Sequence, residues 1–260
     1  MFLNNLKKII DKIFLNISPK LYMGLTRPQD SNDRFLFGAD IIKNRLNSKN
    51  INVLDAGCGG GNFYIYLKSN FPKFKYLGIE YNNQKIKSQK YQEDNFQIIS
   101  HDLRKEWSFG EFDCVWSSEV IEHILDDQSF FQNLIKSTKK EGYIILTTPY
   151  TESYIKFANK FGWSIEPSKI EDGGHVRLGY DENDLNYLAN KYNLKLINIY
   201  FITECSDFRA KNIFKMNKGL FCYIFNILYY LKILNYKRYI SSNANEDKLK
   251  YLSIAAVFQK

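Results

Sequence analysis

Apolar runs alternate with amphipathic stretches through the middle of this chain of 260 residues, and that order limits its fold more than any other feature. The apolar runs predict strands at 51–56, 76–80, 96–100, 112–117, 143–148, 194–201 and 251–258. Stretches with helical periodicity predict helices at 62–69, 83–91, 127–138 and 182–191. Asp181 is placed to cap the last of these helices. Such alternation is typical of an α/β fold with a mainly parallel sheet. We expect this domain over residues 46–260, after an N-terminal helical region at 1–45.

Composition excludes several other classes of protein. Hydrophobic residues make up 45% of the chain and charged residues 25%, which excludes a disordered protein. The four cysteines have neither CxxC nor other metal-ligand spacing, and the three histidines form no HxxxH pair. We therefore expect no metal site, no disulfide framework, and a reducing, cytoplasmic location. No cleavable signal peptide is evident at the N-terminus.

A glycine-rich loop follows the first predicted strand. It runs from Asp55 to Gly61 and leads into a helix, so its backbone amides and the helix N-terminus can face an anionic ligand. A dinucleotide fingerprint needs G-x-G-x-x-G, and its last position is occupied here by Asn62 or Tyr64, according to the register. No GK[ST] phosphate loop is present. The spacing that the loop does have is D-x-G-x-G-x-G.

This loop resembles the first motif of class I methyltransferases that depend on S-adenosylmethionine (SAM), and the resemblance extends over residues 50–202. It implies a Rossmann-like methyltransferase fold, in which a seven-stranded, mainly parallel sheet with an antiparallel last strand carries helices on both faces. It also implies SAM as cofactor, held at the loop by Asp55, Gly57, Gly59 and Gly61. Ligands of open α/β sheets bind beyond the carboxyl ends of the strands, where this loop lies.

Further motifs of that family follow at the predicted strand ends. Glu80 ends the second strand, where the family places an acid on the ribose hydroxyls, and a carboxylate can accept both hydrogen bonds. Asp102 and Leu103 follow the third strand, where the family contacts the adenine. Ser118 and Glu119 begin a stretch that resembles the S-x-x-x-E-H motif of the family's small-molecule branch. The resemblance thus assigns these five residues to the cofactor.

Histidines are the candidates for catalysis, because an imidazole usually removes the proton from an oxygen acceptor near neutral pH. His123 ends the S-x-x-x-E-H stretch, close to the site of methyl transfer in this family. His175 lies in a Gly-Gly-His-Val-Arg segment that resembles the stretch after the fifth strand in small-molecule methyltransferases. Either could be a base, and a structural hydrogen bond is the alternative for both. Arg177 could bind an anionic acceptor or form a surface salt bridge.

The resemblance implies methyl transfer to oxygen, or else to nitrogen or carbon, of a small-molecule, saccharide or lipid-linked acceptor. Methyltransferases that modify amino groups of DNA bases carry N/D-P-P-Y/F/W after the fourth strand, but residues 117–120 read Ser-Ser-Glu-Val. This argues against a base-flipping DNA amino-methyltransferase. The alternative function is a non-catalytic SAM-binding protein or a membrane adaptor. The sequence leaves the oligomeric state open.

The positive charge is concentrated in one segment. The formal net charge is +8, but residues 21–208 carry −3, whereas residues 209–240 carry +7 and no acid. The latter belong to a basic aromatic insertion at 205–248, which the predicted topology places on the active-site side of the sheet. It could be a lid, a membrane-interface segment, or a dimer or partner surface. Its uncharged stretch, 219–231, has 13 residues, fewer than the ~17–25 of a membrane span.

A membrane-surface role draws support from the aromatic residues beside Lys and Arg, which suit the headgroup boundary of an anionic membrane. Residues 2–17 repeat this pattern, with apolar side chains on one helical face and three lysines largely off it. The dense apolar content argues against a phosphate backbone as the partner of these residues. We therefore expect a cytoplasmic enzyme for which peripheral attachment to an anionic membrane is one interpretation.

Overall fold

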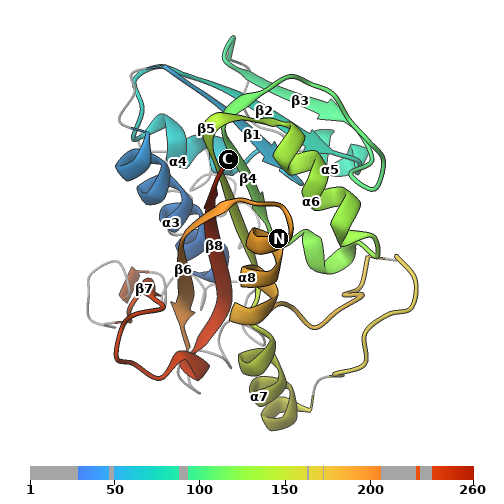
Figure 1. Ribbon diagram of the computed structural model, residues 1–260, viewed down its shortest axis with the longest axis vertical. Helices are drawn as coiled ribbons and strands as arrows, with labels where there is room; N and C mark the ends of the chain where they lie inside the picture. Colours follow the sequence, from blue (N-terminus) through green and yellow to red (C-terminus); the bar gives the residue numbers. More distant parts are fainter. Residues whose placement is uncertain are drawn as a thin grey trace, which may run out of the picture.

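An eight-stranded sheet with helices on both faces organises the described part of the molecule (Figure 1). The computed structural model describes residues 29–46, 50–87, 93–162, 164–171, 173–205, 227–228 and 236–260. The strands are β1 (Ile51–Ala56), β2 (Phe74–Glu80), β3 (Phe96–Ser100), β4 (Phe112–Ser118), β5 (Thr138–Pro149), β6 (Lys195–Glu204), β7 (Tyr239–Ser241) and β8 (Tyr251–Gln259). The α-helices are α3 (Gln29–Arg45), α4 (Phe63–Lys68), α5 (Asn83–Lys87), α6 (Asp127–Lys136), α7 (Thr151–Phe161) and α8 (Glu182–Lys191). Short 3-10 helices are η1 (Ile121–His123) and η2 (Lys248–Lys250).

The strand order is β3-β2-β1-β4-β5-β8-β6-β7. Neighbouring strands from β3 to β5 are parallel, whereas β8 is antiparallel to both β5 and β6. The predicted fold class, a Rossmann-like methyltransferase sheet with an antiparallel last strand, is confirmed. An eighth strand, β7, is added at the edge, where it pairs with β6. It lies within the predicted insertion, and its three residues are too few to give a periodic signal in the sequence.

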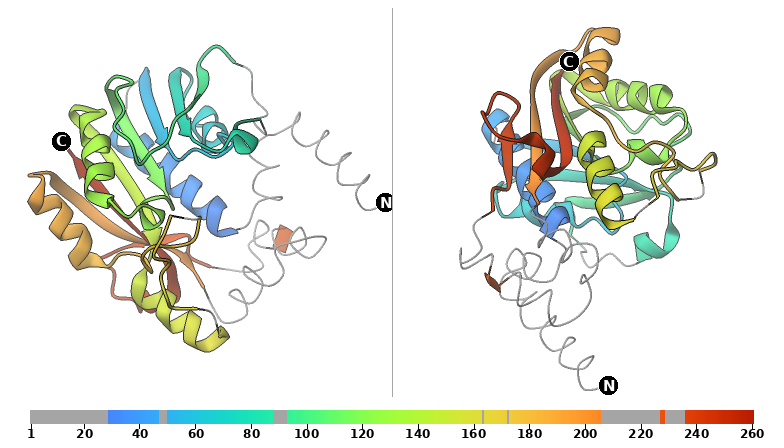
Figure 2. Two further views of the ribbon diagram at one scale, coloured as in Figure 1. Left: turned by 90° about the vertical axis from the view of Figure 1, so that its right-hand side faces the viewer. Right: turned by 90° about the horizontal axis from the view of Figure 1, so that it is seen from below.

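Two hydrophobic cores lie on opposite faces of the sheet, because side chains alternate along each strand. In β4, Val115 belongs to the core under α6 and α8, whereas Cys114 and Trp116 belong to the core under α3 and α4. In β1, Leu54 belongs to the core under α6 and α8, and Val53 belongs to the core under α3 and α4. The view from below in Figure 2 separates the layers, with α3 (blue) on one side and α6 (green) and α8 (orange) on the other. Burial on both faces explains why these strands read as continuous apolar runs.

Helix α7 was not predicted from the sequence, whereas α3 falls within the predicted N-terminal helical region at 1–45. Helix α3 packs against β4, β6 and α4, so this part of the predicted N-terminal region belongs to the layers around the sheet. Residues 1–28 of that region lie outside the described residues. The pattern of α3 is weak because polar residues are spread along it, and even Asp33 is fully buried. The position of α3 brings Arg34 to the strand ends, where its Nε lies 3.7 Å from a carboxylate oxygen of Glu119.

The cap predicted at the start of α8 is present in the structure. Asp181 caps α8 as predicted: its carboxylate accepts a bond from the backbone N–H of Asp184, and the Asp184 carboxylate accepts one from the N–H of Asp181, both at 2.9 Å. The predicted helix at 83–91 is described only as α5, since residues 88–92 lie outside the described part. Among the residues described, no helix is both long and apolar enough to cross a membrane.

The chain between β6 and β7 leaves the sheet and returns to it at adjacent points. The backbone N–H of Thr203 donates to the carbonyl of Arg238 at 2.7 Å, and that of Glu204 donates to the carbonyl of Lys237 at 3.1 Å. These bonds continue the β6–β7 pairing beyond the strands. Residues 206–235, apart from 227–228, lie outside the described part. Because β6 runs in the same direction as β1 and β4, both ends of this segment lie at the sheet edge where those strands end.

Candidate active site

A cleft opens at the carboxyl ends of β1, β2 and β4, where the strand order reverses between β1 and β4. Six of the residues predicted from the sequence line it: Gly57, Glu80, Asp102, Leu103, Glu119 and His123. The other lining residues were not predicted: Tyr81, Lys85, Arg104, Val120, Ile124, Glu171 and Gly173. Most of these residues follow the end of a predicted strand by one to five positions. Their closeness to a strand end is the sequence signal by which they could have been predicted. Asp55, Gly59, Gly61, Ser118 and His175 lie around the cleft without lining it.

Three glycines of the loop adopt left-handed backbone conformations, for two different reasons. At Gly57 (φ 88°) a Cβ atom would lie 2.3 Å from the Val120 side chain, and at Gly61 (φ 72°) one would lie 2.6 Å from the ring of Phe96. These two glycines are therefore needed for packing. At Gly59 (φ 56°) a Cβ atom would meet nothing within 4 Å among the described residues. The backbone at Gly59 thus borders open space, where a ligand can approach it closely.

Glu80 holds the loop and faces the cleft. One carboxylate oxygen accepts the backbone N–H of Gly59 at 3.0 Å, and the other accepts that of Asn82 at 2.9 Å. The side chain is buried, so these bonds fix its direction. Each oxygen can accept a further bond, which suits two neighbouring hydroxyls. The open backbone at Gly59 and this carboxylate together fit a nucleoside with a free ribose diol.

Asp55 lies behind the loop and not on the cleft wall. It is buried, and the Tyr76 hydroxyl donates a 2.5 Å hydrogen bond to it. Burial raises the pKa of Asp55 to about 7, which the bond from Tyr76 opposes and the negative charge of Glu80 reinforces. The structure therefore places this predicted cofactor residue as a support beneath the loop.

The carboxylate of Asp102, on the wall of the cleft, is paired with the side chain of Arg104. The guanidinium of Arg104 donates to it twice, at 2.8 and 2.6 Å, and these bonds lower the pKa of Asp102. Arg104 also pairs with Glu171, at 3.4 Å, from the segment after α7. Leu103 beside it is buried. The adenine contact expected of Asp102 and Leu103 stays a prediction.

The end of β4 carries Ser118 and Glu119. The hydroxyl of Ser118 is 2.8 Å from that of Thr147 on β5. Glu119 has a positive φ of 55°, which is uncommon outside glycine and is stabilised by a hydrogen bond from its N–H to the Thr147 carbonyl. Burial raises the pKa of the Glu119 carboxyl, and Arg34 opposes this effect. Backbone strain of this kind is concentrated at functional sites.

The two predicted catalytic histidines lie together, although 52 positions separate them in the sequence. Their rings are 4.7 Å apart between centroids and nearly perpendicular. Nδ1 of His123 is 2.9 Å from the carbonyl of Gly174 and therefore carries the proton, so Nε2 offers a lone pair. Burial and the neighbouring His123 lower the pKa of His175. Glu122, which the sequence analysis did not assign a role, is fully buried beside them, and burial and the charge of Glu119 raise its pKa.

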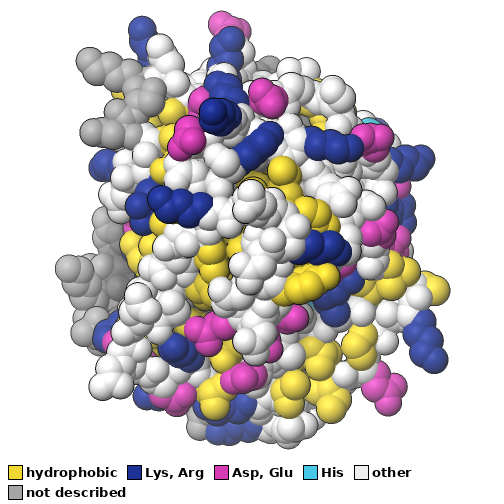
Figure 3. All heavy atoms as spheres, viewed as in Figure 1, with side chains coloured by type: hydrophobic (Ala, Val, Ile, Leu, Met, Phe, Trp, Pro, Cys, Tyr) yellow, Lys and Arg dark blue, Asp and Glu magenta, His cyan; other side chains and the backbone are white. Residues whose placement is uncertain are grey.

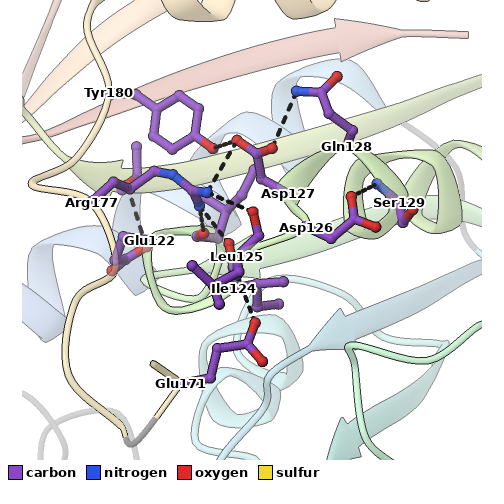
Figure 4. A network of polar contacts seen from close by, with 12 residues as sticks. Glu122, Ile124, Leu125, Asp126, Asp127, Gln128, Ser129, Glu171, Arg177 and Tyr180 are labelled. Atoms are coloured by element: carbon purple, nitrogen blue, oxygen red, sulfur yellow. Dashed lines mark hydrogen bonds and ion pairs between the residues drawn. The ribbon is translucent and has the colours of Figure 1, made fainter. Parts of the chain in front are cut away.

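Arg177 joins the segment that carries His123 to the segment that carries His175 (Figure 4). Its guanidinium donates to the carbonyls of Ile121, Ile124 and Leu125 at 2.5, 2.7 and 3.1 Å. Next to it, the backbone N–H of Val176 donates to the carbonyl of Glu122 at 2.9 Å. Of the two roles considered for Arg177, anion binding and a surface salt bridge, the structure shows neither as the main one. Its main partners are backbone oxygens, with Asp127 at 3.6 Å as an additional ion pair.

A family model described as a methyltransferase domain matches residues 31–199, which is more than half of the chain. The chain belongs to this methyltransferase family. It is a SAM-dependent methyltransferase. The cleft at the glycine loop lies beyond the carboxyl ends of the strands, where open α/β sheets bind their ligands. Bound SAM supplies a methyl group on a positively charged sulfur, and the carboxylates around the cleft suit that charge.

Solved structures show the same fold at low sequence identity. The methyltransferase domain of a bacterial Hen1 protein is 17% identical, with a TM-score of 0.55 over 88% of this chain and 99% of that one. A SAM-dependent methyltransferase from Thermotoga maritima is 13% identical, with a TM-score of 0.59 over 96% and 98%. The plantazolicin methyltransferase, solved with S-adenosylhomocysteine, is 14% identical, with a TM-score of 0.55 over 100% and 92%. No curated protein matches the sequence.

Replacing Glu80 by Gln should weaken SAM binding about tenfold or more, which corresponds to about 1.4 kcal/mol. The amide would turn a donor toward one of the two backbone N–H groups that the carboxylate now accepts, and it would bind a ribose hydroxyl less well. Isothermal titration calorimetry with SAM measures the effect. Glu106→Gln, an exposed carboxylate paired with Lys136, is the control and should bind as the wild type does. Equal affinity in Glu80→Gln would contradict the assignment.

The buried acid Asp55 should make the stability of the enzyme fall between about pH 4 and pH 7. Its pKa is raised in the folded protein, to about 7, so over this range the folded state binds the proton and the unfolded state does not. The stability present at low pH is therefore lost as the pH rises toward 7, by at most roughly 1.4 kcal/mol per pH unit. Asp55→Asn keeps an acceptor for Tyr76 and removes this loss. Urea unfolding of both proteins across this range should show a difference that grows with pH; a constant difference would refute the interpretation.

Proposed function

We propose that this methyltransferase transfers the methyl group of SAM to a hydroxyl oxygen of a small acceptor that is apolar or lipid-linked. The observation that carries this proposal is the group formed by Glu122, His123 and His175, of which His123 lines the cleft. A hydroxyl must lose its proton to become a good nucleophile, whereas a neutral amine needs no such help. Two imidazoles and a buried carboxylate are suited to that task.

The residues would act as follows. The free Nε2 of His123, or the imidazole of His175, takes the proton of the acceptor hydroxyl. The oxygen then forms a bond to the methyl carbon as the carbon–sulfur bond breaks, and the electron pair of that bond passes to sulfur. The products are the methyl ether and S-adenosylhomocysteine, and the imidazole returns its proton to solvent. The chain's main contribution is to align oxygen and methyl group and to exclude water.

The surface beside the cleft supports an apolar acceptor. Leu125, Ile165 and Ile170 are 52%, 44% and 64% exposed, and Tyr81 on the cleft wall is 59% exposed. Figure 3 shows apolar side chains gathered over α7 and the segment that follows it, at the lower right. Exposed apolar groups near one site favour an apolar ligand or a membrane surface. The basic aromatic segment 211–240 returns to the sheet on this same edge, which favours the membrane.

A turnover assay distinguishes an enzyme from a non-catalytic SAM-binding adaptor. With SAM and a panel of hydroxylated apolar compounds, the wild type should release S-adenosylhomocysteine and give a product heavier by one CH₂ unit. His123→Ala and His175→Ala should each lower kcat by roughly 100-fold or more, while SAM affinity stays unchanged. Glu166→Gln, an exposed change on the segment after α7, is the control. Wild-type turnover of amines alone would overturn the choice of oxygen, and full activity in both histidine variants would overturn their role.

Membrane binding is testable because residues 206–235 leave and re-enter the sheet side by side. Replacing them with a short Gly-Ser turn should preserve the β6–β7 hairpin and abolish co-sedimentation with anionic vesicles. Changing Arg209, Lys211, Lys215 and Lys218 to Gln should weaken binding at least tenfold, since each basic residue near an anionic surface contributes about 1 kcal/mol. Neutral phosphatidylcholine vesicles are the control surface. Unchanged sedimentation of the shortened protein would refute this attachment.

A further inference from the structure

Three side chains converge beside the cleft with ligand atoms turned toward one another. Glu122, His123 and His175 each offer one such atom, and the three atoms all lie within 4.8 Å of one another. Oε1 of the fully buried Glu122 has no hydrogen-bond partner among the described residues, and the same holds for the buried Nδ1 of His175. Buried polar atoms in native proteins are nearly always satisfied. The cluster therefore offers a ligand three electron-pair donors, and two of them have no hydrogen bond among the described residues.

The orientation of His123 fits this requirement. Its Nδ1–H donates to the carbonyl of Gly174, which leaves the lone pair of Nε2 directed away from that bond. Nε2 lies 3.9 Å from Oε1 of Glu122, a separation that a single ion between them can bridge. Metal-binding histidines typically donate their second ring N–H to a backbone carbonyl or carboxylate in this way.

The local charge also favours a cation. Glu119 and Glu122 are carboxyls three positions apart, and the side chain of Glu122 is fully buried. Arg34 balances Glu119, to which it lies 3.7 Å away. A divalent cation at Glu122 would balance the second carboxylate and would occupy the atoms left without hydrogen bonds. Two imidazole nitrogens and one carboxylate oxygen suit zinc, cobalt or manganese, whereas magnesium and calcium prefer oxygen ligands alone.

The cluster is held in place before any ligand arrives. Arg177 binds the carbonyls on either side of His123, and the N–H of Val176 binds the carbonyl of Glu122. Val176 directly follows His175, so the same contacts fix both histidines relative to the carboxylate. Three protein ligands leave coordination positions for other molecules, as in catalytic metal sites.

We propose that Glu122, His123 and His175 bind one divalent transition-metal cation, and that this cation receives the hydroxyl of the acceptor during methyl transfer; the second part rests on the proposed function. Coordination would lower the pKa of the hydroxyl, so that its proton passes to solvent water. The oxygen then forms its bond to the methyl carbon, the carbon–sulfur bond breaks, and sulfur keeps the electron pair. In this arrangement the histidines act as ligands, and coordination of the hydroxyl by the cation replaces the direct removal of its proton by an imidazole.

Cobalt(II) is the probe for this site, because its visible absorption reports nitrogen ligands. The full-length protein is treated with a chelator, dialysed, and titrated with Co²⁺ in the absence of SAM and acceptor. We expect one equivalent to bind with a saturable absorption change that Zn²⁺ reverses. Glu122→Gln, His123→Ala and His175→Ala should each weaken Co²⁺ binding about 100-fold. His101→Ala removes the third histidine, which lies outside the cluster, and should leave Co²⁺ binding unchanged.

The wild-type titration decides the matter even where a variant fails to fold. No saturable equivalent of Co²⁺ at millimolar concentration, or equal weakening by His101→Ala, would overturn the cation site. Calorimetry of the metal-free protein with SAM separates the two proposals: SAM binding without Co²⁺ binding removes the cation site alone, and Co²⁺ binding without SAM binding removes the proposed function alone. Turnover that stops with chelator and returns with Co²⁺ or Zn²⁺ supports the role in the reaction, and turnover indifferent to chelator overturns that role.

Discussion

The guanidinium of Arg177 is the interaction on which the acceptor side of the cleft depends. It satisfies three backbone carbonyls around η1, at a place where the chain turns sharply after β4 and has few regular hydrogen bonds of its own. It also lies over the ring of Tyr180, whose hydroxyl is bound to Asp127 at the start of α6. Charge-assisted bonds of this kind are stronger than neutral ones. Together with the bond from the N–H of Val176 to the carbonyl of Glu122 and the contact of His123 with the carbonyl of Gly174, they join the segments that carry His123 and His175.

The glycine loop on the other side of the cleft is held in a different way. There the geometry comes from the sheet itself, since Gly57 and Cys58 both donate to the carbonyl of Ile79 on the neighbouring strand and Gly59 donates to Glu80. The loop therefore moves only as far as β1 and β2 move. Beneath it, Asp55 and Tyr76 form a buried polar pair within the core. The glycine loop is thus held by the sheet, whereas the segments that carry His123 and His175 are joined mainly by contacts of side chains and of irregular backbone.

The sequence was informative where the signal is local. Strand ends, the glycine loop and the cap at Asp181 depend on neighbours a few residues apart, and each appears where periodicity and spacing predict it. The role of Asp55 was less accessible, because a motif position does not reveal that the side chain points into the core toward Tyr76. The sequence indicated a helical region at 1–45 but not that α3 packs on the sheet, because the burial of α3 comes from contacts with β4 and β6, far away in sequence. Glu122 and the contacts of Arg177 with η1 depend on packing between segments about fifty positions apart, which spacing alone cannot show.

The closed base of the β6–β7 hairpin has a consequence for how this enzyme can diversify. The chain leaves the sheet after Cys205 and returns by Tyr236, and backbone hydrogen bonds join its two ends next to these points. The pairing of the strands therefore does not depend on how many residues lie between them. The entropy of closing such a loop rises only by about 0.6 kcal/mol for each doubling of its length. Insertions and deletions between these two points can therefore accumulate in evolution at little cost in stability, while the strands that carry the glycine loop and the end of β4 stay unchanged.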